Sequence, residues 1–229
     1  MEFLENLAGR FYLTFIHEDR WKFFLDGLWM TLLLTAASFI LGTLLGALFC
    51  WMMLSRHKIV RLAARGITAL FVQLPTMVML MISVYIIFSN VPLSVVVIVI
   101  IGLTLKAASY MAEIFYSAVT AVNKGELEAA STLGMTRLQS FRYITLPQAI
   151  TTALPIYKNQ FIITLQETSV VGYLAIMDLT RASDIVTART LDAMFGLISA
   201  ALMYLVIGWI GNALLSLLGR EKHLGGEVR

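Results

Sequence analysis

The sequence predicts an all-α integral membrane protein with about five transmembrane helices. Of its 229 residues, 59% are hydrophobic and only 14% are charged, whereas a soluble domain carries about 25% charged residues. The mean hydropathy is +0.83. Apolar runs of about 20 residues, long enough to cross a hydrocarbon core of ~30 Å, recur along the chain. These three observations exclude a soluble globular domain.

Residues 1–24 are predicted to form an amphipathic segment on the extracytoplasmic surface. Large apolar side chains recur there at roughly helical spacing among polar ones, as in helices that lie on a membrane. They are Phe3, Leu4, Leu7, Phe11 and Phe15. The segment contains four acidic residues and lacks a basic region followed by an apolar core, so a cleaved signal peptide is not expected.

The predicted transmembrane domain covers residues 25–219. Its five apolar runs lie at about residues 27–54, 67–89, 92–117, 156–176 and 191–218. Pro75 lies inside the second run, where its missing N–H and its ring are expected to kink the helix. Gly42 and Gly46 in the first run are expected to allow close helix packing.

The distribution of Lys and Arg predicts the orientation of the chain. Eleven of the 17 lie on one side, ten of them in the segments after runs one, three and five and Lys158 at the start of run four. Five lie before run one or after run four, and Lys106 lies within run three. Because cytoplasmic loops are richer in Lys and Arg, the N-terminus is expected outside. An odd number of spans then places residues 220–229 in the cytoplasm as a tail.

The longest segment between runs, residues 119–155, is polar and is predicted to be a cytoplasmic hairpin. Helices are expected at 124–133 and 136–146, with Gly134 taking a positive φ between them. Leu127, Ala130 and Leu133 are expected to share one helix face. Pro147 and Pro155 are expected to return the chain to the bilayer. The hairpin is either a solvated element without a partner or a docking element for a groove of another protein.

The residues of this hairpin resemble a known signature. The order Gly125, Glu128-Ala129-Ala130, Gly134 and Leu146-Pro147-Gln148-Ala149 is similar to the EAA motif of membrane permease subunits of ABC importers, in its polar amino-acid form. Similarity continues at Gly27 with Thr31-Leu32, at Tyr110 with Glu113, and at 154–162 and 168–180. The resemblance covers roughly residues 20–218.

The resemblance implies a type I importer fold and a set of partners. A second permease subunit, identical or homologous, completes the membrane unit, and an extracytoplasmic binding protein delivers a polar amino acid across the lipid bilayer. The chain is expected in the plasma (inner) membrane of a prokaryote, with no nucleic-acid partner. The residues expected to couple to a cytoplasmic ATPase are Gly125, Glu128, Ala129, Ala130, Leu133 and Gly134.

No stretch resembles the phosphate-binding pattern G-x-x-x-x-G-K-[ST]. ATP and Mg²⁺ are therefore expected on a separate ATPase chain, with no cofactor, metal or catalytic residue on this one. An integral membrane enzyme would require a catalytic set at one depth, which the sequence does not offer. A secondary amino-acid transporter, for which inverted repeats are typical, and a membrane adaptor are the remaining alternatives.

Charged residues inside a membrane span are costly and mark functional sites. Lys106 lies about 21 Å from the outer end of the third run, and Glu167 about 16 Å from the cytoplasmic end of the fourth, at ~1.5 Å per residue. They either contact the ammonium and carboxylate of an amino acid, pair with each other, or have unrelated roles. The tentative substrate pathway comprises Lys106, Gln166, Glu167, Thr168, Ser169 and Gln73.

The chain departs from the family pattern at several of these positions. Relatives commonly have Arg-Gly-Thr-Pro where this chain has Val72-Gln73-Leu74-Pro75, and Lys-Asp-Thr-Ser where it has 166–169. Tyr116 replaces a common Arg, and Lys106 replaces a neutral residue. Three basic positions are lost and one is gained, so the resemblance leaves the substrate open within the polar amino acids.

Overall fold

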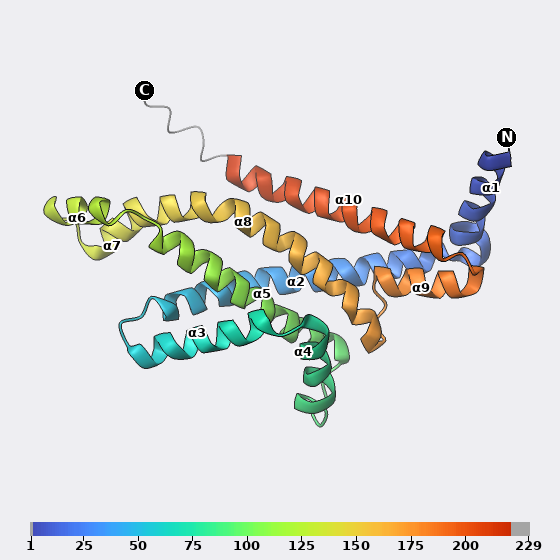
Figure 1. Ribbon diagram of the computed structural model, residues 1–229, viewed down its shortest axis with the longest axis horizontal. Helices are drawn as coiled ribbons and strands as arrows, with labels where there is room; N and C mark the ends of the chain where they lie inside the picture. Colours follow the sequence, from blue (N-terminus) through green and yellow to red (C-terminus); the bar gives the residue numbers. More distant parts are fainter. Residues whose placement is uncertain (1, 221–229) are drawn as a thin grey trace. The chain divides into compact units, whose positions relative to one another are not determined.

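The computed structural model describes residues 2–220, which are almost entirely helical (Figure 1). The chain divides into two compact units. Unit 1 comprises Met1–Ser38, Pro75–Leu103 and Ile162–Ala213, and unit 2 comprises Phe39–Leu74, Thr104–Phe161 and Leu214–Arg229. The tail expected at 220–229 lies outside the described residues except for Arg220.

Three helices of the described part are each long and apolar enough to cross a membrane. They are α2 (Trp21–Met53), α5 (Val95–Thr120) and α10 (Ala193–Arg220). Two further candidate spans are bent pairs. The first joins α3 (Lys58–Gln73) to α4 (Thr76–Ile82) with η3 (Ser83–Ile87), and the second joins the helical stretch 137–174 to α9 (Leu179–Thr190). The predicted all-helical membrane class is confirmed, with five spans when each pair counts as one.

The second span is broken at Pro75, which is a larger change than the predicted kink. Helix α3 ends at Gln73, and both Leu74 (φ −72°, ψ 132°) and Pro75 (φ −58°, ψ 132°) have extended backbones. Proline disfavours the helical conformation of the residue before it. Pro75 then precedes α4, where its missing N–H costs nothing because the first N–H groups of a helix have no intrahelical partner.

Pro147 and Pro155, in contrast, do not interrupt the chain. The π-helical turn η4 (Phe141–Thr145) runs directly into α8 (Leu146–Glu167), which contains both prolines. The N–H of Leu146 bonds to the carbonyl of Phe141, five residues back. This wider turn accommodates the proline that follows, so the span expected to begin at 156 is continuous with the second helix of the hairpin.

The core of unit 1 surrounds a buried aspartate. Asp178 is fully buried at the N-terminus of α9, and its carboxylate accepts hydrogen bonds from the N–H groups of Thr180 (3.2 Å) and Arg181 (3.0 Å) and from the hydroxyl of Tyr204 (3.2 Å). The capping of α9 thereby satisfies a charge that would otherwise be costly to bury. The apolar residues of this core are Phe24, Leu165, Leu179, Ala182, Val186 and Ile207.

Helix α2 approaches this aspartate through a glycine. A Cβ atom on Gly27 would lie 2.6 Å from the carbonyl oxygen of Asp178, and the N–H of Leu179 donates to Thr31 Oγ1 at 3.2 Å. Gly27 and Thr31, two positions of the family resemblance, therefore hold α2 against the start of α9. Their role in this structure is packing.

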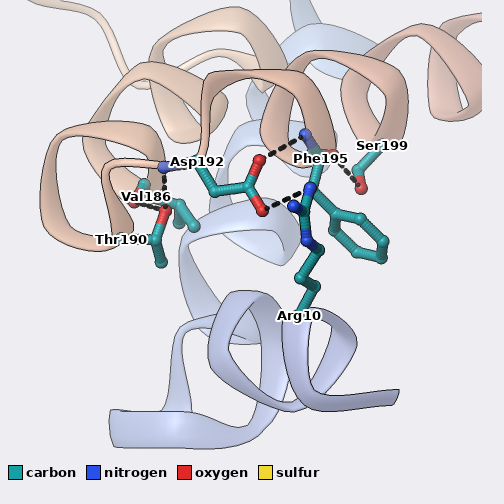
Figure 2. Close-up of polar contacts among 6 residues, drawn as sticks. All are labelled: Arg10, Val186, Thr190, Asp192, Phe195 and Ser199. Atoms are coloured by element: carbon teal, nitrogen blue, oxygen red, sulfur yellow. Dashed lines mark hydrogen bonds and ion pairs between the residues drawn. The ribbon is translucent and has the colours of Figure 1, made fainter. Parts of the chain in front are cut away.

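The N-terminal segment is helical, as predicted, and within unit 1 it contacts the turn between α9 and α10. It comprises α1 (Glu2–Phe11), η1 (Tyr12–Ile16) and η2 (His17–Asp19). Arg10 Nη1 lies 3.3 Å from Asp192 Oδ2, and Asp192 Oδ1 accepts from the N–H of Phe195 at 3.1 Å (Figure 2). The position of this segment on a membrane surface stays a prediction.

Unit 2 is packed through small residues of α2. A Cβ on Gly42 would lie 2.7 Å from Ala107 Cβ, and one on Gly46 would lie 2.5 Å from Met111 Cβ. The predicted close packing at these glycines is confirmed, because neither position has room for a larger residue beside α5.

Candidate functional sites

The first candidate site is the polar hairpin, residues 123–145 in unit 2. Helix α6 (Lys124–Thr132) begins where the side chain of Asn123 accepts from the N–H of Gly125 at 2.9 Å. It ends at Thr132, with Leu133 as its C-cap, and Gly134 follows with a φ of +77°. The N–H groups of Gly134 and Met135 bond to the carbonyls of Ser131 and Ala130, each at 3.0 Å, which is a Schellman motif. The predicted turn at Gly134 is confirmed.

The second arm of the hairpin begins with a capping box that the sequence interpretation missed. Gln139 N–H donates to Thr136 Oγ1 at 3.3 Å, and the N–H of Thr136 donates to Gln139 Oε1 at 2.8 Å. The Thr-x-x-Gln pattern at 136–139 is the sequence signal for it. Helix α7 (Arg137–Ser140) follows and continues through η4 into α8.

A side-chain contact joins the two arms. Gln148 Nε2 donates to Glu126 Oε2 at 2.5 Å, so the Gln of the LPQA stretch holds the first turn of α6. Figure 1 shows α6 and α7 folded back beside each other at the yellow-green part of the chain. The caps, the Schellman turn and this contact together give the hairpin a defined shape.

The apolar residues predicted to share one face of α6 differ in their exposure. Ala130 is buried (2% exposed) and Leu127 is half-buried, but Leu133 is 82% exposed. Leu133 is the C-cap residue of α6, with φ −78° and ψ 6°, and its side chain is exposed at the end of the helix. Leu138 is 75% exposed, so an exposed leucine lies on either side of Gly134 in the sequence. We call these two residues the apolar tip.

The coupling residues of the resemblance lie on the same hairpin. Gly125, Glu128 and Ala129 are exposed along α6, and Gly134 is exposed at the turn. Ala130 instead faces inward.

The second candidate site is formed by the polar residues of the spans. Lys106 in α5 is 3% exposed, and its Nζ donates to the carbonyl oxygen of Leu74. Leu74 caps the C-terminus of α3, where carbonyls lack intrahelical partners and the helix dipole favours a cation. One role of Lys106, within unit 2, is therefore to stabilise the end of a broken span.

Glu167, within unit 1, contacts the other side of the same break. The hydroxyl of Thr76, the first residue of α4, donates to Glu167 Oε1 at 3.1 Å. Lys106 and Glu167 thus each contact a residue adjacent to Pro75 in the sequence. The pairing of Lys106 with Glu167 stays a prediction.

The remaining predicted pathway residues differ in their exposure and contacts. Thr168 is fully buried and donates to the carbonyl of Leu165 at 2.7 Å, while Gln73 and Gln166 are exposed. Ser169 lies in unit 1 on the wall of a cavity of about 250 Å³. The other residues that line the cavity are Gly172, Tyr173, Ala175, Thr180, Arg181 and Asp184.

Tyr116, the residue that replaces a common Arg, has a basic partner. Arg65 Nη2 donates to the Tyr116 hydroxyl at 2.7 Å, and its guanidinium lies 5.3 Å from the centre of the ring. The contact joins α3 to α5 within unit 2. No sequence pattern in either helix alone would have indicated it.

The profile of the binding-protein-dependent transport system inner membrane component family matches residues 38–223. The chain belongs to this family. The match covers the polar hairpin, both sides of the Pro75 break, Lys106 and Glu167. Family membership identifies a transport permease subunit and a multi-pass membrane protein, and it argues against the enzyme and adaptor alternatives.

Curated relatives from the transport family are similar over most of their length. A probable amino-acid ABC transporter permease protein, YckA of Bacillus subtilis, is 30% identical over 82% of this chain and 84% of its own. The histidine/lysine/arginine/ornithine transport system permease protein HisQ of Salmonella typhimurium is 29% identical over 88% of this chain and 93% of its own. A putative glutamine transport system permease protein, GlnP of Rickettsia prowazekii, is 30% identical over 78% and 83%.

Solved structures of ABC transporters share the fold. A chain of an amino acid ABC transporter crystallised with histidines has a TM-score of 0.79 and 32% identity, covering 87% of this chain and 94% of that one. A chain of the inward-facing MetNI methionine ABC transporter has a TM-score of 0.69 at 19% identity, which shows a shared fold alone. The predicted importer permease fold is confirmed.

Proposed function

We propose that this chain is the membrane permease subunit of an ATP-driven importer of polar amino acids. The observation that carries the proposal is the polar hairpin with its capped arms and apolar tip. The hairpin lies within the residues that match the binding-protein-dependent transport family. The names of the relatives YckA, GlnP and HisQ support an amino-acid substrate. An extracytoplasmic binding protein would deliver it.

The hairpin is proposed to dock onto a separate cytoplasmic ATPase that binds ATP and Mg²⁺. Leu133 and Leu138 supply the apolar contact. The exposed residues Gly125, Glu128 and Ala129 form a helix surface that can fit into a groove of the ATPase. Helical residues run without an extended break from Arg137 to Glu167. A displacement of the hairpin would therefore be carried along α8 toward Glu167.

The assembly and its placement follow from the same proposal. Five spans are few to enclose a gated pathway, which supports pairing with a second permease subunit, identical or homologous. The excess of Lys and Arg after runs one, three and five supports a cytoplasmic hairpin and an external N-terminus. The membrane is proposed to be the inner (plasma) membrane of a prokaryote.

The proposed substrate pathway consists of Lys106, Glu167 and the polar residues Gln73, Gln166, Thr168 and Ser169. Ser169 has the strongest support, because its cavity also presents Arg181 and Asp184, two exposed side chains of opposite charge. An amino acid carries an ammonium and a carboxylate, which such a pair can match. Lys106 and Glu167 stay proposed as substrate contacts or as a structural pair.

The experiment that tests this function combines ATPase binding with transport. The chain would be reconstituted in proteoliposomes with its ATPase and binding protein, and uptake of labelled amino acids would be measured. Ala130→Arg inserts a charge where a buried methyl group packs and should abolish stimulated ATP hydrolysis and uptake while the protein still inserts. Gly66→Ala is the control, since no atom lies within 4 Å of a Cβ at that position. Uptake that proceeds on an ion gradient without ATP would instead identify a secondary transporter.

A further inference from the structure

The turn from α2 into α3 concentrates positive charge without any acidic residue nearby in the sequence. No Asp or Glu occurs between Asp26 and Glu113, whereas Arg56, Lys58 and Arg61 follow one another within six residues. Arg56 and Lys58 are exposed and Arg61 is half-buried. Among the described residues none of these three side chains forms an ion pair. We call residues 54–65 the basic elbow.

The arrangement of side chains around α3 brings this charge next to an exposed apolar surface. Successive helix residues are about 100° apart, so Arg61 and Lys58 lie roughly 60° and 120° from the buried Ala64. By the same rotation Leu62 lies roughly 160° from Ala64 and Ile59 beyond it. Leu62 is 73% exposed and Ile59 84% exposed. Around the helix, a packed face is thus followed by a basic sector and then by an apolar one.

This order of sectors is the one expected of a helix at the boundary between headgroups and acyl chains. Trp51, near the end of α2, is 72% exposed, and tryptophan is enriched at that boundary. The Lys and Arg excess that orients a membrane protein requires only charge in the loop. It does not require exposed apolar residues adjoining the basic sector.

We propose that the basic elbow binds anionic phospholipid. Arg56, Lys58 and Arg61 would contact the phosphate groups of the leaflet next to the α2–α3 turn, and Ile59 and Leu62 would lie among the acyl chains. Charge complementarity selects the anionic headgroup, because the elbow contains four cations, three of them besides the Arg65 that bonds to Tyr116, and no anion. If the elbow were instead a docking surface for a soluble protein, the apolar side chain of Ile59 would be exposed to water whenever that partner was absent.

The expected effect is large enough to measure. A basic residue near an anionic membrane surface contributes about 1 kcal/mol, or roughly fivefold in affinity. The intact protein would be purified from nanodiscs of phosphatidylcholine that contain either no phosphatidylglycerol or about one-third of it. Native mass spectrometry would give the ratio of the two lipids bound, and thermal unfolding would give the accompanying stabilisation.

Three variants make the test specific. Arg56→Gln/Lys58→Gln/Arg61→Gln should lose the enrichment of phosphatidylglycerol by at least tenfold and should lose the stabilisation. Lys124→Gln/Arg137→Gln/Arg142→Gln removes the same charge from exposed positions of the polar hairpin and should retain both. Arg56→Lys/Arg61→Lys preserves the charge and should also retain both.

Two results would overturn the proposal. The first is an equal loss of phosphatidylglycerol enrichment in the elbow and hairpin triple variants. That result would mean that lipid binding depends only on the net charge of the protein. The second is an elbow variant that binds lipid as the unaltered chain does but no longer retains the ATPase in a pull-down. That result would assign the elbow to a protein partner instead.

Discussion

The ammonium group of Lys106 donates a hydrogen bond to the carbonyl oxygen of Leu74, the residue that ends α3. A lysine within a transmembrane helix thus satisfies a backbone group that the break at Pro75 leaves without a helical partner. The contact gives a buried charge a structural purpose that is independent of any substrate.

Replacing Lys106 separates this purpose from substrate contact. Lys106→Met should destabilise the protein by about 1.5–3 kcal/mol, the range for hydrogen bonds that involve a charged group, as measured by denaturant unfolding in detergent. Lys106→Arg should lose less, because it keeps the cation. Unchanged apparent affinity and selectivity of uptake in Lys106→Met, at normal protein level, would rule out substrate contact.

Thr76→Val tests the contact on the other side of the break. The variant removes the donor to Glu167 and should cost about 1–3 kcal/mol, the penalty for leaving a partly buried polar group with one bond fewer. Thr35→Val is a matched control, since its buried hydroxyl donates only to the carbonyl of Thr31 in its own helix. Equal losses of unfolding free energy in both variants would contradict a specific role for Thr76.

Gly134→Ala should strain the tip of the polar hairpin. The residue has φ +77° with no atom within 4 Å of a Cβ, so the cost is conformational, about 1–2 kcal/mol. Because the Schellman turn sets the direction of the second arm, ATPase retention in a pull-down should fall along with stability. Gly66→Ala, in open space within α3, should leave both unchanged or slightly raise the unfolding midpoint. Wild-type ATPase retention in Gly134→Ala would show that the turn is not needed for docking.

Gly27→Ala should be among the more destabilising single-methyl additions in unit 1. The new Cβ would lie 2.6 Å from the backbone oxygen of Asp178, and overpacking of this kind costs about 1–3 kcal/mol. The control is Gly208→Ala in α10, where the nearest atom would be Leu165 Cδ2 at an ordinary 3.9 Å. Thermal unfolding of both variants measures the difference, and a Gly27→Ala midpoint equal to that of Gly208→Ala would refute the close approach.

Asp192 has two functions that two substitutions can separate. Asp192→Asn keeps the side-chain oxygen that accepts from Phe195 N–H and removes the charge opposite Arg10, so it should cost under about 1 kcal/mol. Asp192→Ala removes the cap of α10 as well and should cost about 1 kcal/mol more. Denaturant unfolding at low and high salt provides the measurement. A loss in Asp192→Asn that exceeds the additional loss from Asn to Ala would show that the ion pair outweighs the cap.

Features that depend on local pattern could be predicted from the sequence. Apolar length predicted the class, and it predicted five spans, which the structure matches when each bent pair counts as one. The position of Gly134 between two polar helical stretches predicted the turn of the hairpin. Pro75 was predicted to disrupt its helix. The extent of the break, however, depends on whether neighbouring groups can form hydrogen bonds with the backbone groups that lose their helical partners. Lys106 supplies one such group from 32 residues away.

The features that the sequence did not indicate depend on backbone groups and on the path of the chain, which leave no pattern of side chains in the sequence. The acceptor for Lys106 is a backbone carbonyl, and the cavity beside Ser169 arises where the chain turns between η5 (Thr168–Leu174) and α9. The sequence also did not indicate that Pro147 and Pro155 would lie within a continuous helical stretch, which a π-helical turn precedes. The exposure of Leu133 could not be predicted from helical spacing, because spacing assigns a residue to a helix face without showing what packs against that face.

The break at Pro75 also constrains the order in which the chain can be assembled. Helices α3 and α4 meet at a backbone carbonyl that hydrocarbon cannot satisfy, and the ammonium that satisfies it belongs to α5. During synthesis this part of the chain emerges before its partner. The second span is therefore expected to remain beside the insertion machinery until the third has been made, so that the two enter the lipid together.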